Sequence, residues 1–162
     1  GISRVWSHKY MYCGCPDLLG VRNDTIIIGD FKTSNQPYCR YYPTKEASKE
    51  NRSLFTGWNK FNKCAMQLAA YAQACSETLG IEVSCAEIIV STPEINQSFI
   101  LNKNELAKFL TKWLQKVRRY QEIKEEERIA KQILKDARED LASSQVSSDQ
   151  GDKADHCPAT VS

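Results

Sequence analysis

The sequence lacks any apolar run long enough to span a membrane as a helix, which takes about 18 residues. Its 7 cysteines form no C-x-x-C pair, so neither a zinc ribbon nor a disulfide framework is indicated, and we expect reduced thiols. A large excess of one charge is also missing, since 22 Lys and Arg balance 20 Asp and Glu to a net charge of +2. Taken over the whole chain, this charge does not indicate a nucleic-acid partner.

No targeting segment can be read at the N-terminus, where the sequence begins at Gly1 without an initiator methionine. We therefore expect a processed N-terminus or a fragment. The length of 162 residues suits one domain, and a hydrophobic content of 41% is enough for a core.

The first half of the sequence predicts strands, then a loop, then a helix. Residues 3–34 are rich in β-branched and aromatic residues, with a turn signal at Asn23-Asp24 before the apolar run 25–28, which is typical of a buried strand. Residues 35–60 are polar and predict a long loop. Apolar residues at helical spacing predict a helix over 61–79 that ends at Gly80.

The second half predicts a strand within 81–92 that ends at Pro93, a short strand at 97–101, and a long helix from Glu105 capped by Asn102 or Asn104. The helix becomes charged after Tyr120, and the chain from residue 143 is predicted to be disordered. The expected fold is a mixed α/β (α+β) domain with a small mixed central sheet flanked by helices and a long C-terminal helix. We divide it into a core at 1–122, a charged helical extension at 123–142 and a tail at 143–162.

Three charged residues carry the most informative pattern. Asp30 follows the apolar strand directly, and Lys32 lies two residues on, so both project from the same face. The Asn23-Asp24 turn can fold Asp17 back beside Asp30. The alternative without a functional role is an ion pair on the protein surface, which contributes little to stability.

Two neighbouring carboxylates repel each other unless one keeps its proton or a cation lies between them. Mg²⁺ or Mn²⁺ can fill this role, because both ions bind oxygen ligands such as the two carboxylates, and the carbonyl of Phe31 can be a further ligand. Such an ion activates water and neutralises phosphoryl charge, while Lys32 can stabilise the transition state. The set therefore suits metal-assisted hydrolysis of a phosphodiester.

Two further segments admit a functional and a structural interpretation. Gln67 and Tyr71 share one helix face, where they can contact phosphate or hold Lys32, or can simply belong to an amphipathic core helix. Residues 1–79 carry 10 basic and 6 acidic residues, and the basic, aromatic loop at 40–63 can bind single strands or pack on the domain. The aromatic residues in and beside this loop are Tyr38, Tyr41, Tyr42, Phe55, Trp58 and Phe61.

These motifs together resemble the PD-(D/E)XK nuclease superfamily. The resemblance rests on Gly14-x-x-Asp17, on the strand ending Asp30-Phe31-Lys32-Thr33-Ser34, and on the Gln67-x-x-x-Tyr71 helix. It covers roughly residues 5–122 and is nearest to the RecB-type exonuclease branch, which includes the mitochondrial genome maintenance exonuclease and related phage and bacterial exonucleases.

The resemblance implies a restriction-endonuclease-like core in which Asp17 and Asp30 bind the metal and Lys32 is the catalytic lysine. Gln67 and Tyr71, with Thr33 and Ser34, would contact the substrate. The family usually adds an acidic residue, often with a histidine, from a helix before the first strand, and that helix is absent from this sequence. His8 is not its equivalent, and an iron–sulfur cluster is not expected, because only Cys157 follows residue 85.

The resulting hypothesis is a Mg²⁺- or Mn²⁺-dependent deoxyribonuclease, an exonuclease on single-stranded DNA ends in repair, recombination or genome maintenance. It would work inside the cell, in the cytoplasm or nucleoid or in a mitochondrion, with DNA as its partner and no membrane. One alternative is a nuclease-like DNA-binding module without catalysis. Another is an unrelated α/β interaction domain, which we expect if Asp17, Asp30 and Lys32 lie far apart.

Overall fold

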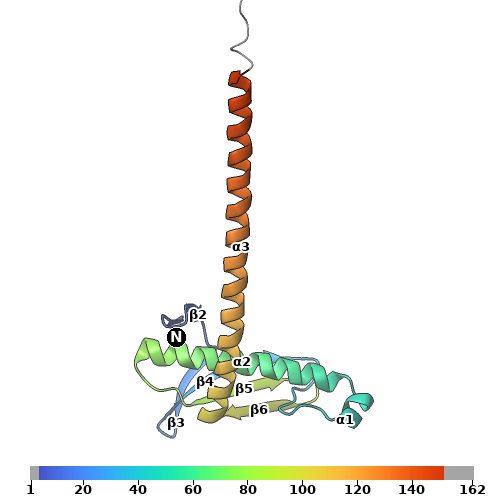
Figure 1. The fold of residues 1–162 in the computed structure, drawn as a ribbon. Coiled ribbons are helices and arrows are strands. Elements are labelled where there is room, and N and C mark those ends of the chain that lie inside the picture. Colours follow the sequence, from blue (N-terminus) through green and yellow to red (C-terminus); the bar gives the residue numbers. More distant parts are fainter. Residues whose placement is uncertain (1–3, 152–162) are drawn as a thin grey trace, which may run out of the picture. The chain divides into compact units, whose positions relative to one another are not determined.

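The computed structural model describes residues 4–151, and its architecture is mixed α/β, as the sequence predicts. The chain divides into two compact units, Gly1–Val117 and Arg118–Ser162, so the predicted core ends at 117 rather than 122. Figure 1 shows strands and helices of the first unit and the long helix α3. The elements are β1 (Val5–Ser7), β2 (Tyr12–Gly14), β3 (Leu18–Arg22), β4 (Thr25–Thr33), α1 (Lys45–Glu50), α2 (Ser53–Leu79), β5 (Cys85–Ser91), β6 (Asn96–Leu101) and α3 (Lys103–Gly151).

The main sheet has four strands in the order β3-β4-β5-β6, and β1 pairs with β2 in a separate two-stranded sheet. β4 pairs antiparallel with β3 and parallel with β5, and β5 pairs antiparallel with β6. β4 and β5 are therefore the central strands, and their carboxyl ends lie side by side. This arrangement confirms the prediction of a small mixed sheet.

A tight turn joins β3 to β4. Asn23 and Asp24 both have positive φ, 50° and 60°, which is the backbone of the two-residue turn that suits a twisted hairpin. The turn sets the register in which Leu18 pairs with Gly29. Residue 17 is consequently brought next to residue 30, as the sequence predicts.

Helix α2 covers one face of the main sheet (Figure 1). Its buried residues meet the inward-facing residues of β4, β5 and β6, of which Ile28, Ile88 and Leu101 are fully buried. The helix ends at Gly80, whose φ of 66° places it in the left-handed region and whose N–H bonds to the carbonyl of Ser76. The apolar face of α2 thus forms the centre of the core.

The predicted loop at 35–60 is wrong over most of its second half, because α1 and the first turns of α2 occupy it. The start of α2 gives little sequence signal, since its cap residue Arg52 makes no side-chain capping bond and Gly57 disfavours a helix. Gly57 is instead required by packing, because a Cβ there would come within 2.5 Å of the carbonyl oxygen of Pro37. Tertiary contact overrides local propensity here.

Helix α3 begins after Asn102, whose side chain accepts the N–H of Glu105, so Asn102 rather than Asn104 is the cap. Its charged part forms ion pairs such as Lys124 with Glu127, most of them between residues three apart. Residues 143–151 continue the helix, so the prediction of disorder is wrong there, since extending an existing helix needs no new nucleus. The rest of that predicted tail, with Cys157, lies outside the described residues.

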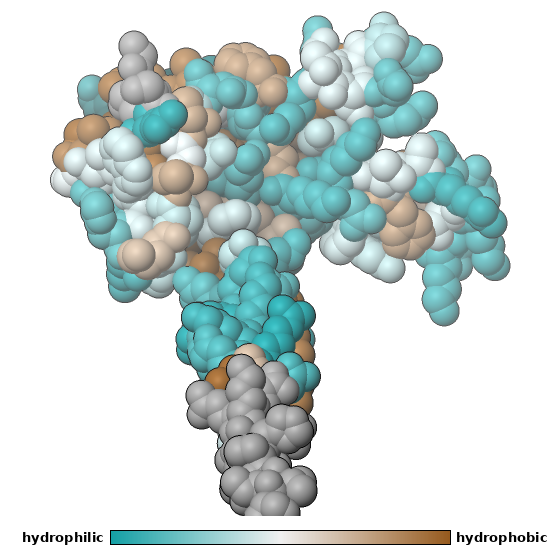
Figure 2. Space-filling model, turned by 90° about the horizontal axis from the view of Figure 1, so that it is seen from above, coloured by the Kyte–Doolittle hydropathy of each residue, from teal (hydrophilic) through white to brown (hydrophobic). Residues whose placement is uncertain are grey.

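None of the helices in the described part of the chain combines the length and apolar character needed to cross a bilayer. On the face shown in Figure 2, hydrophobic residues form small, separate patches among hydrophilic ones. The described residues thus contain no membrane-spanning helix, as the sequence predicts.

Candidate active site

The three charged residues singled out in the sequence come together beside the end of β4. Lys32 Nζ lies 3.0 Å from Asp30 Oδ2, so these two side chains form an ion pair on the same face of the strand. Asp17 Oδ2 accepts the backbone N–H of Phe31 at 3.0 Å, and the Asp17 and Asp30 carboxyls also interact directly. A wide separation of these side chains would have favoured the interaction-domain interpretation, and they lie together instead.

Asp30 is the most enclosed member of this group, with 5% of its surface exposed. Its Oδ2 atom also accepts a hydrogen bond from Cys64 Sγ at 3.0 Å, a contact that the sequence analysis missed. A signal for it exists, because Cys64 lies three residues before Gln67 and seven before Tyr71, which puts all three on one face of α2. Asp30 is therefore held from both its own strand and the covering helix.

The two carboxyls have opposite electrostatic environments. Burial and the contact with Asp17 raise the pKa of Asp30, although Cys64 and Lys32 act in the other direction. The contact with Asp30 and the N–H of Phe31 lower the pKa of Asp17. Burial works against the charge of Lys32, but Asp30 outweighs it and raises the pKa of Lys32, so this side chain stays cationic at neutral pH.

Tyr71 and Gln67 hold each other rather than Lys32. Gln67 Nε2 donates to the Tyr71 hydroxyl at 2.9 Å, and the backbone of Cys15 also hydrogen-bonds that hydroxyl. The ring of Tyr71 lies directly against Gly14, because a Cβ on Gly14 would come within 1.9 Å of it. This contact explains the glycine of the Gly14-x-x-Asp17 motif as the residue that leaves room for Tyr71.

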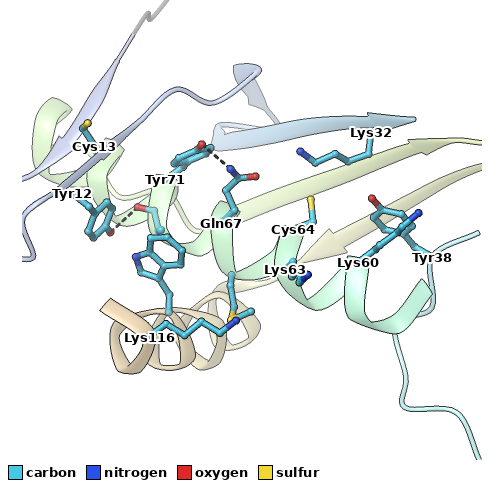
Figure 3. A pocket seen from close by; sticks show the side chains of 13 residues that line it. Tyr12, Cys13, Lys32, Tyr38, Lys60, Lys63, Cys64, Gln67, Tyr71 and Lys116 are labelled. Atoms are coloured by element: carbon cyan, nitrogen blue, oxygen red, sulfur yellow. Dashed lines mark hydrogen bonds between the residues drawn. The ribbon is translucent and has the colours of Figure 1, made fainter. Parts of the chain in front are cut away.

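A cavity of about 600 Å³ opens beside these groups. Figure 3 shows Lys32 reaching into it from β4, while Cys64, Gln67 and Tyr71 approach from α2. Four lysines and four aromatic side chains are among its lining residues, which gives the cavity a cationic and aromatic character. These are Lys32, Lys60, Lys63 and Lys116, and Tyr12, Tyr38, Tyr71 and Trp113.

The remaining predicted site residues lie around this centre. The side chain of Phe31 faces away from Asp30 and is 53% exposed, so only its backbone belongs to the site, and its carbonyl as a metal ligand stays a prediction. Thr33 and Ser34 line a second, separate cavity at the end of β4. His8 lies in the exposed turn between β1 and β2, outside both groups of lining residues.

The aromatic residues in and beside the expected loop divide between two roles. Tyr38 and Phe61 are buried in the core, as the packing alternative proposed. Tyr42 instead stacks edge-to-face on Phe55 and Trp58, with ring centres 5.2 Å and 4.9 Å away, and Tyr41 is 81% exposed. Most of residues 40–63 is helical rather than loop, and part of the segment is core, while its binding of single strands stays a prediction.

The donor set fits an oxygen-preferring divalent cation. Asp17 and Asp30 are in contact, and two carboxyls at such a distance need a proton or a cation between them. Within residues 4–151, no group of three or more His, Cys, Asp or Glu side chains is placed to hold a metal ion. Mg²⁺ does not require three, because it retains waters and is commonly bound by one or two carboxylates with a substrate phosphate.

Comparison with known proteins adds no family to this geometry: no protein-family model matches the chain, and no curated protein is significantly similar to it. The site must therefore be interpreted from its own residues.

Proposed function

We propose that this protein is a Mg²⁺- or Mn²⁺-dependent nuclease that hydrolyses DNA phosphodiester bonds, an exonuclease on single-stranded ends in repair, recombination or genome maintenance. The observation that carries the proposal is the contact of Asp17, Asp30 and Lys32 at the edge of a cavity lined by further lysines. The resemblance of the surrounding motifs to RecB-type PD-(D/E)XK nucleases supports it.

In this proposal Asp17 and Asp30 would hold the cation through their carboxylate oxygens. The bound cation supplies a water of lowered pKa and neutralises charge on the phosphate. A cation held between the two carboxylates would compensate the negative charge of both, which otherwise requires a proton. The N–H of Phe31 keeps the Asp17 carboxylate oriented toward Asp30.

Lys32 acts as a fixed positive charge and not as a base, because its raised pKa keeps the ammonium protonated. Placed 3.0 Å from Asp30, it lies beside the phosphate and stabilises the negative charge that grows on the phosphoryl oxygens. Water attacks phosphorus and releases one proton to solvent, the bond to the leaving ester oxygen breaks, and that oxygen takes up a proton from solvent.

The cavity favours a nucleic acid over a small phosphate ester. Its lysines can neutralise several backbone phosphates, and its aromatic side chains can stack on unpaired bases. Tyr71 contributes a hydroxyl that accepts from Gln67 and from the Cys15 backbone, which leaves its own hydrogen for a phosphate oxygen. These features support a single-stranded substrate.

Digestion of an end-labelled single-stranded oligonucleotide by the full-length protein tests the proposal, with Mg²⁺ and with EDTA. Lys32→Met and Asp30→Asn are expected to lower the cleavage rate by about a hundredfold or more, since Lys32 stabilises transition-state charge and Asp30 would hold the cation. Lys108→Met, an exposed lysine on α3 outside the cavity lining, is the matched control and should cut like wild type. Equal rates in all four proteins would show that this site does not catalyse cleavage.

A second candidate is a DNA-binding module without catalysis. Among the described residues only two acidic side chains meet at the site, and that observation favours it. Salt-dependent binding of single-stranded DNA, with no Mg²⁺-dependent cleavage by the full-length protein, would establish this candidate over the nuclease.

A further inference from the structure

A second cavity, of about 530 Å³, lies where the parallel strands β4 and β5 end. The N–H of Ser34 donates to the carbonyl of Ser91 at 2.9 Å, so the pairing of the two strands extends to the edge of this cavity. Its lining holds hydroxyls, one amide and one ammonium, with no carboxylate. The residues are Thr33, Ser34, Asn35, Lys60, Ser91, Thr92 and Pro93.

The polar groups of this cavity are not all committed to the protein. Ser34 is 9% exposed, and its Oγ accepts from the N–H of Gln36 at 3.3 Å and from Lys60 Nζ at 3.2 Å. Its own hydroxyl hydrogen therefore remains for another acceptor. Thr92 differs, because its hydroxyl both donates to the carbonyl of Ile95 and accepts the N–H of Ile95.

The composition of the lining selects an anion. Lys60 brings a positive charge with two hydrogens beyond the one that it gives to Ser34, and the hydroxyl of Ser34 is a further donor. Because the lining contains no carboxylate, it has no negative charge to bind a cation and none to repel a phosphate. The two remaining hydrogens of Lys60 and the hydroxyl hydrogen of Ser34, whose donor atoms lie 3.2 Å apart, match the oxygens of a phosphate group.

The position of the cavity relates it to the candidate active site. Lys60 lines both cavities. Ser34 follows Lys32 by two residues, and two residues of extended chain span about 6.6 Å. A phosphate bound beside Ser34 would thus lie a short step along a nucleic-acid strand from a phosphate bound beside Lys32.

We propose that the cavity at the ends of β4 and β5 is a phosphate subsite, formed by Ser34 and Lys60, which binds a phosphate next to the one that is cleaved. The proposal rests on the proposed nuclease function for the identity of the strand, but phosphate binding here does not itself require catalysis. The phosphate is either part of the continuous backbone or a terminal monoester at the strand end.

Phosphate binding is tested first without any cleavage. Inorganic phosphate is titrated into the full-length protein in EDTA, and the amide NMR signals are followed. We expect saturable shifts at residues 33–35 and at Ser91, with affinity reduced about tenfold in Lys60→Met, which loses a charged donor. Ser34→Ala should weaken phosphate binding as well. Because Lys60 is exposed, Lys60→Met is not expected to disturb folding, so weaker binding by that variant reports on the subsite itself. Wild-type affinity in both variants, or no shifts at these residues, overturns the subsite.

Cleavage assays then separate the two sources of the phosphate. If wild type cleaves strands with phosphorylated and unphosphorylated ends at different rates, and Lys60→Met cleaves both at the same rate, the bound phosphate is a terminal monoester. A single methylphosphonate linkage that slows wild type, but has no further effect in Lys60→Met, identifies a backbone phosphate. Phosphate-induced NMR shifts without DNA cleavage would support the subsite and refute the nuclease function. Cleavage at the wild-type rate by both Lys60→Met and Ser34→Ala would support the nuclease function and refute the subsite.

Discussion

The two halves of strand β4 contrast in what they contribute. Its first half, Ile26–Ile28, is apolar and ends in Ile28, which is fully buried beneath α2. Its second half places a buried carboxyl, Asp30, against Lys32 on the same face of the strand and against the thiol of Cys64 on α2. The first half stabilises the fold by burial of apolar surface, and the second carries an ionisable group whose burial opposes its charge.

This contrast shows where the sequence departs from what stability alone would select. A buried apolar residue at position 30 would avoid the desolvation of a carboxyl, yet the chain keeps Asp30 and surrounds it with partners. Such costly groups concentrate at functional sites. Substitutions in the two halves are therefore expected to affect different properties, stability in the first and the candidate site in the second.

The largest loss of stability is expected in the apolar half. Ile28→Ala should lower the free energy of unfolding by about 2–5 kcal/mol, because it leaves a cavity under α2. Urea unfolding measures this change. The matched control is Ile100→Ala on β6, which is 49% exposed and should lose less than about 1 kcal/mol. Similar losses for the two variants would contradict the proposed packing of β4.

Near the polar half, the ring of Tyr71 packs directly against Gly14. Gly14→Ala would place a methyl group within 1.9 Å of the Tyr71 ring, so we expect a loss of about 1–3 kcal/mol and a displaced Tyr71. Thermal unfolding and the cleavage rate should both change. Gly20→Ala is the control, because nothing lies within 4 Å of a Cβ there. A Gly14→Ala protein as stable and active as Gly20→Ala would rule out this arrangement.

The geometry of the charged centre could be predicted because it follows from local rules. The two-residue period of a strand puts Asp30 and Lys32 on one face, and the Asn23-Asp24 turn sets the hairpin that returns Asp17 to them. The strands and the cap at Gly80 follow from patterns of the same kind.

The remaining features depend on contacts between distant segments. The role of Cys64 needs the placement of α2 over β4, and the early start of α2 depends on the close approach of Gly57 to Pro37. The fit between Gly14 and Tyr71 joins residues far apart in the chain. Helical spacing puts Cys64 on one face with Gln67 and Tyr71, but no local period or propensity encodes which distant segment each of these residues approaches.

A smaller and pH-dependent effect is expected at Asp30. Since burial and Asp17 raise the pKa of Asp30 in the fold, its ionised form opposes folding above that pKa. Asp30→Asn should therefore be more stable than wild type at about pH 8 in EDTA, and the advantage should shrink toward about pH 4. Chemical unfolding across this range measures the difference. Parallel stability profiles would mean that the fold does not perturb Asp30.

The smallest effect is expected at Cys64. Its hydrogen bond lowers the pKa of Asp30, so Cys64→Ala should raise the titration midpoint of the Asp30 carboxyl, while Cys64→Ser keeps a donor and should remain nearer to wild type. NMR titration of the carboxyl carbon in EDTA reports the midpoint. A midpoint that falls or stays the same in Cys64→Ala would show that the thiol does not donate to Asp30.

Binding of Mn²⁺, followed by electron paramagnetic resonance, tests most directly the central claim that Asp17 and Asp30 form a divalent-metal site. Wild type should bind the ion, and Asp17→Asn and Asp30→Asn should each weaken binding at least about tenfold, because each removes an anionic ligand. Glu87→Gln, on the other face of the sheet beside Arg22, should bind like wild type. Equal affinity in all four proteins would contradict the claim.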